Sequence, residues 1–209
     1  MKPGDSTAET SRLSLPERAA RPARFALLLL IGAAMPRSAA AEVREQLATT
    51  EYAVTGNPSA SLLQLLNAAS PVREYGRTFH GYTKWYVSWR YRWNESADGS
   101  CRISSVTTRV DGHTTLPRLV GGSAEQRLRF DTYLAALRIH ELGHFAIAQQ
   151  AGREIDAGIL ALPQMHNCAT LESAANDFGR RVLNQHLARE KQYDATTEHG
   201  KSQGAWLER

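Results

Sequence analysis

The chain of 209 residues carries 25 Lys and Arg against 21 Asp and Glu, a formal net charge of +4. Six of the basic and three of the acidic residues lie in the first 41 positions, so the remaining 168 residues carry 19 basic and 18 acidic side chains. Such a nearly neutral segment gives no electrostatic case for nucleic-acid binding, and its length suits one domain with a real core.

The start of the chain has the pattern of an export signal. Two arginines precede an apolar run from Phe25 to Met35, and three alanines then supply a small-residue cleavage site before Glu42. The run is too short to span a bilayer as a stable helix. We therefore expect a signal peptide over residues 1–41, a periplasmic or secreted domain over residues 42–209, and no stable membrane insertion after cleavage. An uncleaved membrane anchor is the alternative.

The first predicted elements of the exported domain are short. Residues 42–50 read as a polar lead-in, and Glu51–Gly56 alternates in polarity before a glycine, which predicts a strand. Ser59 is the predicted N-cap of a helix that runs to about Ala69.

The clearest strand prediction covers Arg77–Asn94. Hydrophobic side chains alternate with polar ones, so one face of this strand is aromatic and the other polar. The aromatic row consists of Trp85, Val87, Trp89, Tyr91 and Trp93. We expect this row to pack against helices, with a ligand platform as the alternative.

A turn at Asp98–Gly99 predicts a hairpin with a partner strand over Cys101–Val110. Asp111–Gly112 then predicts another turn, and Leu116–Pro117 predicts a loop.

Helical patterns fill the second half of the chain. Ser123 and Gln126 form a capping-box pair, which predicts a helix start, and Gly152 is a possible helix end. Helical character can resume over residues 155–162. A last helix is capped by Asn167 or Thr170, runs to about Lys191 and is followed by a polar tail.

The long helix contains the sequence His-Glu-Leu-Gly-His at residues 140–144. Residues four apart lie on one face of a helix, so His140 and His144 can offer two imidazoles to one metal ion. Glu141 is then placed to take a proton from an activated water, which is the arrangement of metallohydrolases. The alternative is a buried helix whose two histidines only make core hydrogen bonds.

A catalytic zinc site needs a third protein ligand. The sequence leaves three candidates open: His199 and Asp194 in the polar tail, and Glu172 in the last helix. Cys101 and Cys168 lie in the exported part, where oxidising conditions favour a single disulfide between them. Two buried thiols are the alternative.

The exported chain resembles a bacterial family of predicted secreted zinc-dependent proteases, long known as a domain of unknown function. The matching residues lie between about Tyr52 and Gly204. They are Tyr52, Val54 and Gly56, the alternating Thr83, Trp85, Val87 and Trp89, Cys101, Leu116 and Pro117, the His140–His144 motif, Cys168, and Tyr193, Asp194, Thr197, His199 and Gly200. This resemblance implies export, Zn²⁺ and peptide hydrolysis, and it favours His199 as the third ligand.

These observations predict an exported zinc metallopeptidase with a peptide or protein substrate. Glu141 is the predicted general base, and Tyr193 the predicted stabiliser of the oxyanion. The alternatives are a non-catalytic metal-binding envelope module and a zinc amidase acting on cell-wall peptides. The predicted fold is α+β and zincin-like: a small antiparallel sheet packed on the motif helix and the C-terminal helix.

Overall fold

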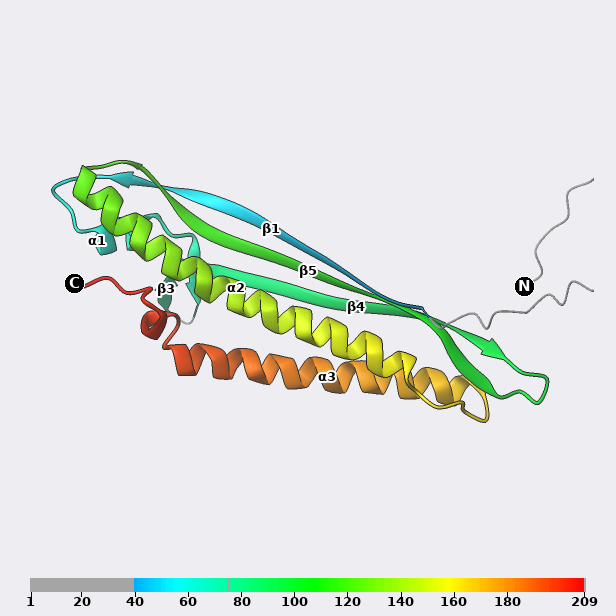
Figure 1. Cartoon of the computed structure of the whole chain (residues 1–209). Coiled ribbons are helices and arrows are strands. Elements are labelled where there is room, and N and C mark those ends of the chain that lie inside the picture. Colours follow the sequence, from blue (N-terminus) through cyan, green and yellow to red (C-terminus); the bar gives the residue numbers. More distant parts are fainter. Residues whose placement is uncertain (1–39, 75, 209) are drawn as a thin grey trace, which may run out of the picture. The chain divides into compact units, whose positions relative to one another are not determined.

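The computed structural model describes residues 40–74 and 76–208 (Figure 1). The predicted signal segment lies outside these residues, except that Ala40 and Ala41 already belong to the first strand. In the described part, no helix is both long enough and apolar enough to cross a membrane. Within this part of the chain, helices and a sheet pack together, so the predicted α+β class is confirmed.

The elements follow one another in an order of strands first and long helices last. They are β1 (Ala40–Gly56), α1 (Leu62–Ala69), β2 (Val72–Glu74), β3 (Arg77–Phe79), β4 (Tyr82–Glu95), β5 (Cys101–Gly121), α2 (Ala124–Leu160), α3 (Cys168–Thr197) and the 3₁₀ turn η1 (Lys201–Gln203). The short strands β2 and β3 form a hairpin of their own. The long helices α2 and α3 lie on the same side of the main sheet (Figure 1).

The main sheet has the strand order β1-β5-β4. Strands β4 and β5 pair antiparallel, as the hairpin prediction required. Strand β1 joins the other edge of β5 in parallel, so the sheet is mixed rather than wholly antiparallel. A parallel partner needs a long crossover, and here α1, the β2–β3 hairpin and β4 all lie between β1 and β5 in sequence.

Strand β5 is longer than predicted, because two expected breaks lie inside it. Gly112 pairs with Leu47 on one side and Trp85 on the other, and a side chain there would collide with the ring of Phe145. The predicted turn is therefore wrong, because this glycine marks a close approach of α2 to the sheet. Pro117 pairs with Tyr52 of β1 but lies beyond Thr115, the last residue of β5 that pairs with β4, and its missing N–H is tolerated there.

Helix α2 begins as predicted and ends later. The capping box between Ser123 and Gln126 is present, with both reciprocal hydrogen bonds. Gly152 does not end the helix, because its role is to let the backbone pack on Val110, which a side chain at this position would overlap. The segment predicted separately over residues 155–162 is the last part of this one helix, up to Leu160.

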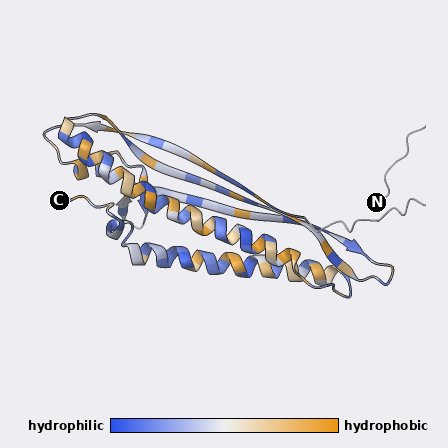
Figure 2. Cartoon of the chain, in the orientation of Figure 1, coloured by the Kyte–Doolittle hydropathy of each residue, from blue (hydrophilic) through white to orange (hydrophobic). Residues whose placement is uncertain are grey.

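The helices on either side of α2 also differ from prediction at their ends. Ser61, rather than Ser59, caps α1. Asn167 caps α3 as predicted, but α3 continues past Lys191 to Thr197. Hydrophobic and hydrophilic residues are interspersed along both long helices (Figure 2). In the added turns of α3, Tyr193 and Asp194 are half-buried and Thr197 is buried.

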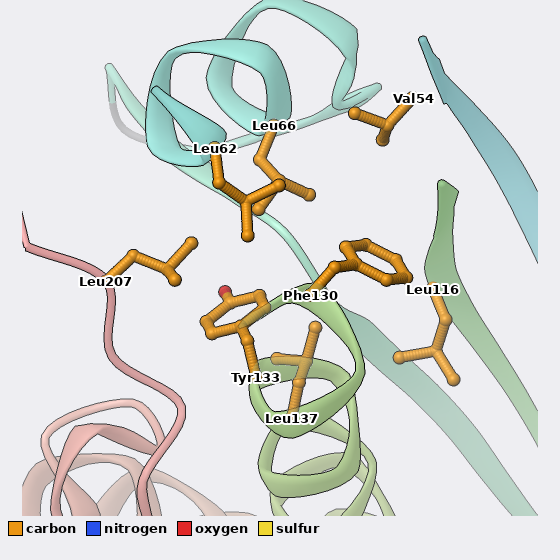
Figure 3. Close-up of a cluster of buried hydrophobic side chains, with 8 residues drawn as sticks. All are labelled: Val54, Leu62, Leu66, Leu116, Phe130, Tyr133, Leu137 and Leu207. Atoms are coloured by element: carbon orange, nitrogen blue, oxygen red, sulfur yellow. The ribbon is translucent and has the colours of Figure 1, made fainter. Parts of the chain in front are cut away.

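The core lies along one face of α2, from the start of this helix to its end. One cluster joins the start of α2 to α1, to the ends of β1 and β5, and to the C-terminal segment (Figure 3). Its buried members are Val54, Leu62, Leu66, Leu116, Phe130, Tyr133, Leu137 and Leu207. A second cluster joins the end of α2 to the start of α3 and to β5, and it includes Val87, Trp89 and Tyr91 of the aromatic row. The prediction that this row packs against helices is confirmed.

The predicted disulfide between Cys101 and Cys168 is present. It joins the first residue of β5 to the first residue of α3, with the two Cα atoms 5.0 Å apart. The bridge therefore fixes the end of α3 that lies far from the motif histidines. With 1.5 Å of rise per residue, the opposite end of α3, near residue 194, is roughly 40 Å away.

Candidate metal centre

The three motif side chains come from the middle of α2 and are all buried. His140 and Glu141 are 4% exposed and His144 is 6% exposed. Their helix face is turned toward the last turns of α3 and the first residues of β4. The helical spacing of four therefore brings the two imidazoles together, as the sequence predicted.

Three donor atoms converge at this point. The Nε2 atoms of His140 and His144 lie 3.3 Å apart, and Asp194 Oδ1 lies 3.2 Å from the first and 3.1 Å from the second. Zinc bonds of 2.0–2.2 Å in a tetrahedral arrangement place neighbouring donor atoms about 3.3–3.5 Å apart. The residues present therefore fit a tetrahedral metal ion.

Asp194, and not His199, completes the group of donor atoms formed with the two histidines. The Nδ1 atom of His199 lies 3.5 Å from Asp194 Oδ1, and the His199 side chain is 37% exposed. Among the described residues around this point, His140, His144 and Asp194 are the ones whose donor atoms all lie within 4.8 Å of one another. Asp194, an open candidate in the sequence, is therefore favoured, and His199 is its neighbour on the outer side.

Glu172 is excluded as a ligand. It is exposed, and it lies in the first turns of α3, where its main-chain oxygen accepts a hydrogen bond from Tyr91. Asp194 is near the opposite end of the same helix, roughly 33 Å farther along its axis.

Charge and burial act against each other at this cluster. Burial raises the pKa of Asp194, but hydrogen bonds from His140 and His144 outweigh it and hold that pKa well below its usual range. Burial lowers the pKa of His144, but hydrogen bonding to Asp194 and Glu190 prevails and raises it to about 9. An ionised carboxylate facing two imidazoles attracts a proton or a cation to the space between them.

Each histidine has a polar group behind its other ring nitrogen. The Nδ1 atom of His140 lies 2.9 Å from Gln203 Oε1, and that of His144 lies 3.4 Å from Glu190 Oε1. Glu190 also accepts a hydrogen bond of 3.1 Å from Trp85 Nε1, which ties the site to β4. For His140 the acceptor behind the ring favours the tautomer in which Nε2 is free to bind a metal, whereas Nδ1 of His144 makes no hydrogen bond.

Tyr193 directs its hydroxyl to the backbone of α2, so its position does not support the predicted oxyanion role. Its hydroxyl donates to the main-chain oxygen of His140 at 3.2 Å and contacts Gln203, and the residue does not line the cavity described below. Its ring stacks on His140, with centroids 5.1 Å apart and planes inclined by 12°. Gly143 leaves the room for this ring, since a side chain there would overlap it.

Glu141 has a buried oxygen with no hydrogen-bond partner, Oε2. Burial raises the pKa of this carboxyl group. Its other oxygen, Oε1, lies over Gly81, where an added Cβ would come within 2.5 Å. A buried carboxylate oxygen without a partner suits a group that binds water or a substrate proton.

A cavity of about 420 Å³ opens beside Glu141 and the three donor atoms. Its walls come from the β2–β3 hairpin and the start of β4, from α2, from the end of α3, and from the C-terminal segment. The lining includes Phe79, His80, Thr83, His199, Lys201 and Trp206. The cavity beside the candidate metal centre therefore has the volume of a pocket for a small molecule or for part of a peptide.

Sequence reasoning missed Glu190, Gln203 and Gly81. Glu190 precedes Asp194 by four residues, a spacing that puts both carboxylates on one helix face once α3 is known to continue that far. No local pattern marks Gln203 or Gly81, because their roles come from contacts between distant segments.

The fold and the site together define an α+β protein with a candidate centre of two histidines and one aspartate between two helices. The chain belongs to a bacterial protein family of unknown function, DUF922, whose family model matches residues 49–200. That range includes the motif on α2 and Asp194, and it stops before Gln203. No curated protein and no solved structure matches the chain.

Proposed function

We propose that this protein is an exported zinc metallopeptidase, in which His140, His144 and Asp194 hold the ion and Glu141 is the general base. The observation that carries the proposal is the triangle of donor atoms, 3.1–3.3 Å on each side, next to a cavity. Two imidazoles with one carboxylate are a donor set that catalytic zinc sites use.

When bound at such a site, zinc polarises a carbonyl oxygen and lowers the pKa of a water molecule. Glu141 takes the proton of the attacking water and passes it to the leaving amine, because burial raises the pKa of its carboxyl group and Oε2 is free. A binding module would need the two histidines and Asp194, but it would have no use for this carboxylate.

The first residues of β4 are the proposed place for the substrate backbone. Strand β4 is an edge of the three-stranded sheet, and Tyr82 and Thr83 line the cavity. An extended peptide can add to an exposed strand edge by main-chain hydrogen bonds. The proposal rests on analogy with zincin-like proteases, which bind an extended substrate at an edge strand beside the motif helix.

The test is metal analysis of the purified protein together with hydrolysis of a mixed peptide library. We expect about one zinc ion per chain and cleavage that stops when zinc is chelated. Glu141→Gln should keep zinc and the fold but lose hydrolysis, since an amide of the same size cannot accept the proton. Equal cleavage by this variant would remove Glu141 from the reaction. Zinc without any cleavage would indicate the binding module, and cleavage of cell-wall peptides alone would indicate the amidase.

A further inference from the structure

Three hydrogen bonds form a closed ring that begins and ends at His140. The Nδ1 atom of His140 lies 2.9 Å from Gln203 Oε1, Gln203 Nε2 donates to the Tyr193 hydroxyl at 3.0 Å, and that hydroxyl donates to the His140 main-chain oxygen at 3.2 Å. We infer that Gln203 and Tyr193 are positioning residues, which hold His140 in the tautomer and orientation that metal binding requires. The inference rests on the proposed function.

The ring has only one consistent direction. A main-chain oxygen can only accept, so the Tyr193 hydroxyl hydrogen points to His140, and the hydroxyl oxygen then accepts from the amide nitrogen of Gln203. The amide oxygen is thereby turned toward His140 Nδ1, which must carry a hydrogen. The hydroxyl also lies 3.4 Å from that amide oxygen, and this longer contact is the weaker alternative to its 3.2 Å donation to the His140 main-chain oxygen.

The consequence falls on the other nitrogen of the same imidazole. With the hydrogen on Nδ1, the Nε2 atom of neutral His140 keeps its lone pair, and this atom faces Asp194 Oδ1 at 3.2 Å and His144 Nε2 at 3.3 Å. The ring of hydrogen bonds therefore favours the metal-binding tautomer, in competition with a hydrogen bond from Nε2 to Asp194.

The backbone around Gln203 is shaped to complete the ring. Glu198, His199 and Gly200 have φ values of 49°, 53° and 84°, three successive residues in the left-handed region. Two of them are not glycine, and such conformations cost free energy that other contacts must offset. This turn lets η1 carry Gln203 back over α2, with Gly200 packed close to the His140 ring.

The test measures zinc affinity by competition with a chromophoric chelator. Gln203→Met keeps the length of the side chain and removes both polar groups, so we expect zinc binding at least about tenfold weaker. Gln203→Glu keeps an oxygen for the Nδ1 hydrogen and should recover most of the affinity. Gln192→Met changes an exposed glutamine of α3 in the same way and should leave zinc affinity unchanged. Tyr193→Phe, which retains the ring, should give an intermediate loss.

A second readout reports the hydrogen itself. In the zinc-loaded wild type, nitrogen-15 spectra of the histidine rings should show an Nδ1 proton of His140 that exchanges slowly with water, and Gln203→Met should speed its exchange. Wild-type protein without zinc would overturn the proposed function and this inference together. Equal zinc affinity of wild type and Gln203→Met would overturn this inference alone. So would a Tyr193→Phe variant that keeps full affinity but loses all hydrolysis, because Tyr193 would then act on the substrate.

Discussion

Asp194 lies 3.1 Å from His144, with its Oδ1 atom facing the Nε2 atom of the imidazole. The two side chains come from neighbouring helices, α3 and α2. The contact places a carboxylate of the last turns of α3 where the family resemblance favoured the imidazole of His199.

The third ligand can be tested directly by substitution. Asp194→Ala should weaken zinc binding by more than about a hundredfold. Removing a metal ligand costs more affinity than removing a residue that only hydrogen-bonds to a ligand. His199→Ala should bind zinc within a few-fold of wild type, because its ring only contacts Asp194 from outside. The measurement is zinc affinity of the two variants side by side, and the reverse order would restore His199 as the ligand.

Gly81 should control the position of Glu141. In Gly81→Ala, the new Cβ would come within 2.5 Å of Glu141 Oε1, so the carboxylate must shift. We expect zinc affinity to stay unchanged. We expect kcat to fall by about ten- to a hundredfold, because a small displacement of a catalytic group has an effect of this size. Unchanged kcat would show that the carboxylate has room to adjust. Loss of zinc would show that the substitution disturbs α2 as a whole.

The protein should lose stability in acid through His80. Burial lowers the pKa of this imidazole from 6.5 to about 4. Its Nε2 donates to Asn67 at 2.9 Å and its Nδ1 accepts from the Tyr133 hydroxyl at 2.7 Å, which suits the neutral ring. A histidine with a lowered folded pKa gives its full stabilisation above pH 6.5 and loses it as the pH falls toward 4.

The measurement is the free energy of unfolding in the presence of a chelator at pH 7.5 and 4.5. Wild type should lose on the order of 2 kcal/mol from this group, after allowance for its partial exposure. His80→Gln should be less stable at pH 7.5 and show a smaller fall with pH. His113→Gln, an exposed position on β5, should fall as wild type does. An equal fall in all three proteins would assign the acid effect to other groups.

The disulfide should stabilise the fold without affecting the metal. Replacing Cys101 and Cys168 with serine opens a loop with a sequence separation of 67 residues. Loop-closure entropy predicts a loss of about 4 kcal/mol in the free energy of unfolding. Zinc affinity of the folded double variant should match wild type, since the bridge is at the other end of α3. A weaker zinc affinity at a temperature well below unfolding would show that α3 transmits the constraint.

The motif on α2 could be predicted because its information is local. His144 follows His140 by four positions, and the helix that aligns them has its own capping box at Ser123. The ligand on α3 depends on where that helix ends. The last turns of α3 carry polar side chains that face either solvent or the donor cluster. The regular spacing of hydrophobic residues that predicts a helix is therefore absent between Lys191 and Thr197, and the sequence does not show that the helix continues.

The sheet was predicted in part for a related reason. The aromatic alternation of β4 identifies a half-buried strand, and its packing on α3 follows from that pattern. Asp111–Gly112 has the local composition of a turn, yet pairing with β1 and β4 on both sides keeps it extended. Tertiary contacts override local turn signals here, and one sequence does not display those contacts.

The donor set has an order in time as well as in space. His140 and His144 are synthesised well before Asp194, and Gln203 follows later still. A nascent chain that stops before Asp194 therefore has the two imidazoles without the carboxylate that completes the triangle. In the proposed enzyme, tight capture of zinc waits until almost all of the described chain has been made, so an interrupted polypeptide acquires no peptidase activity.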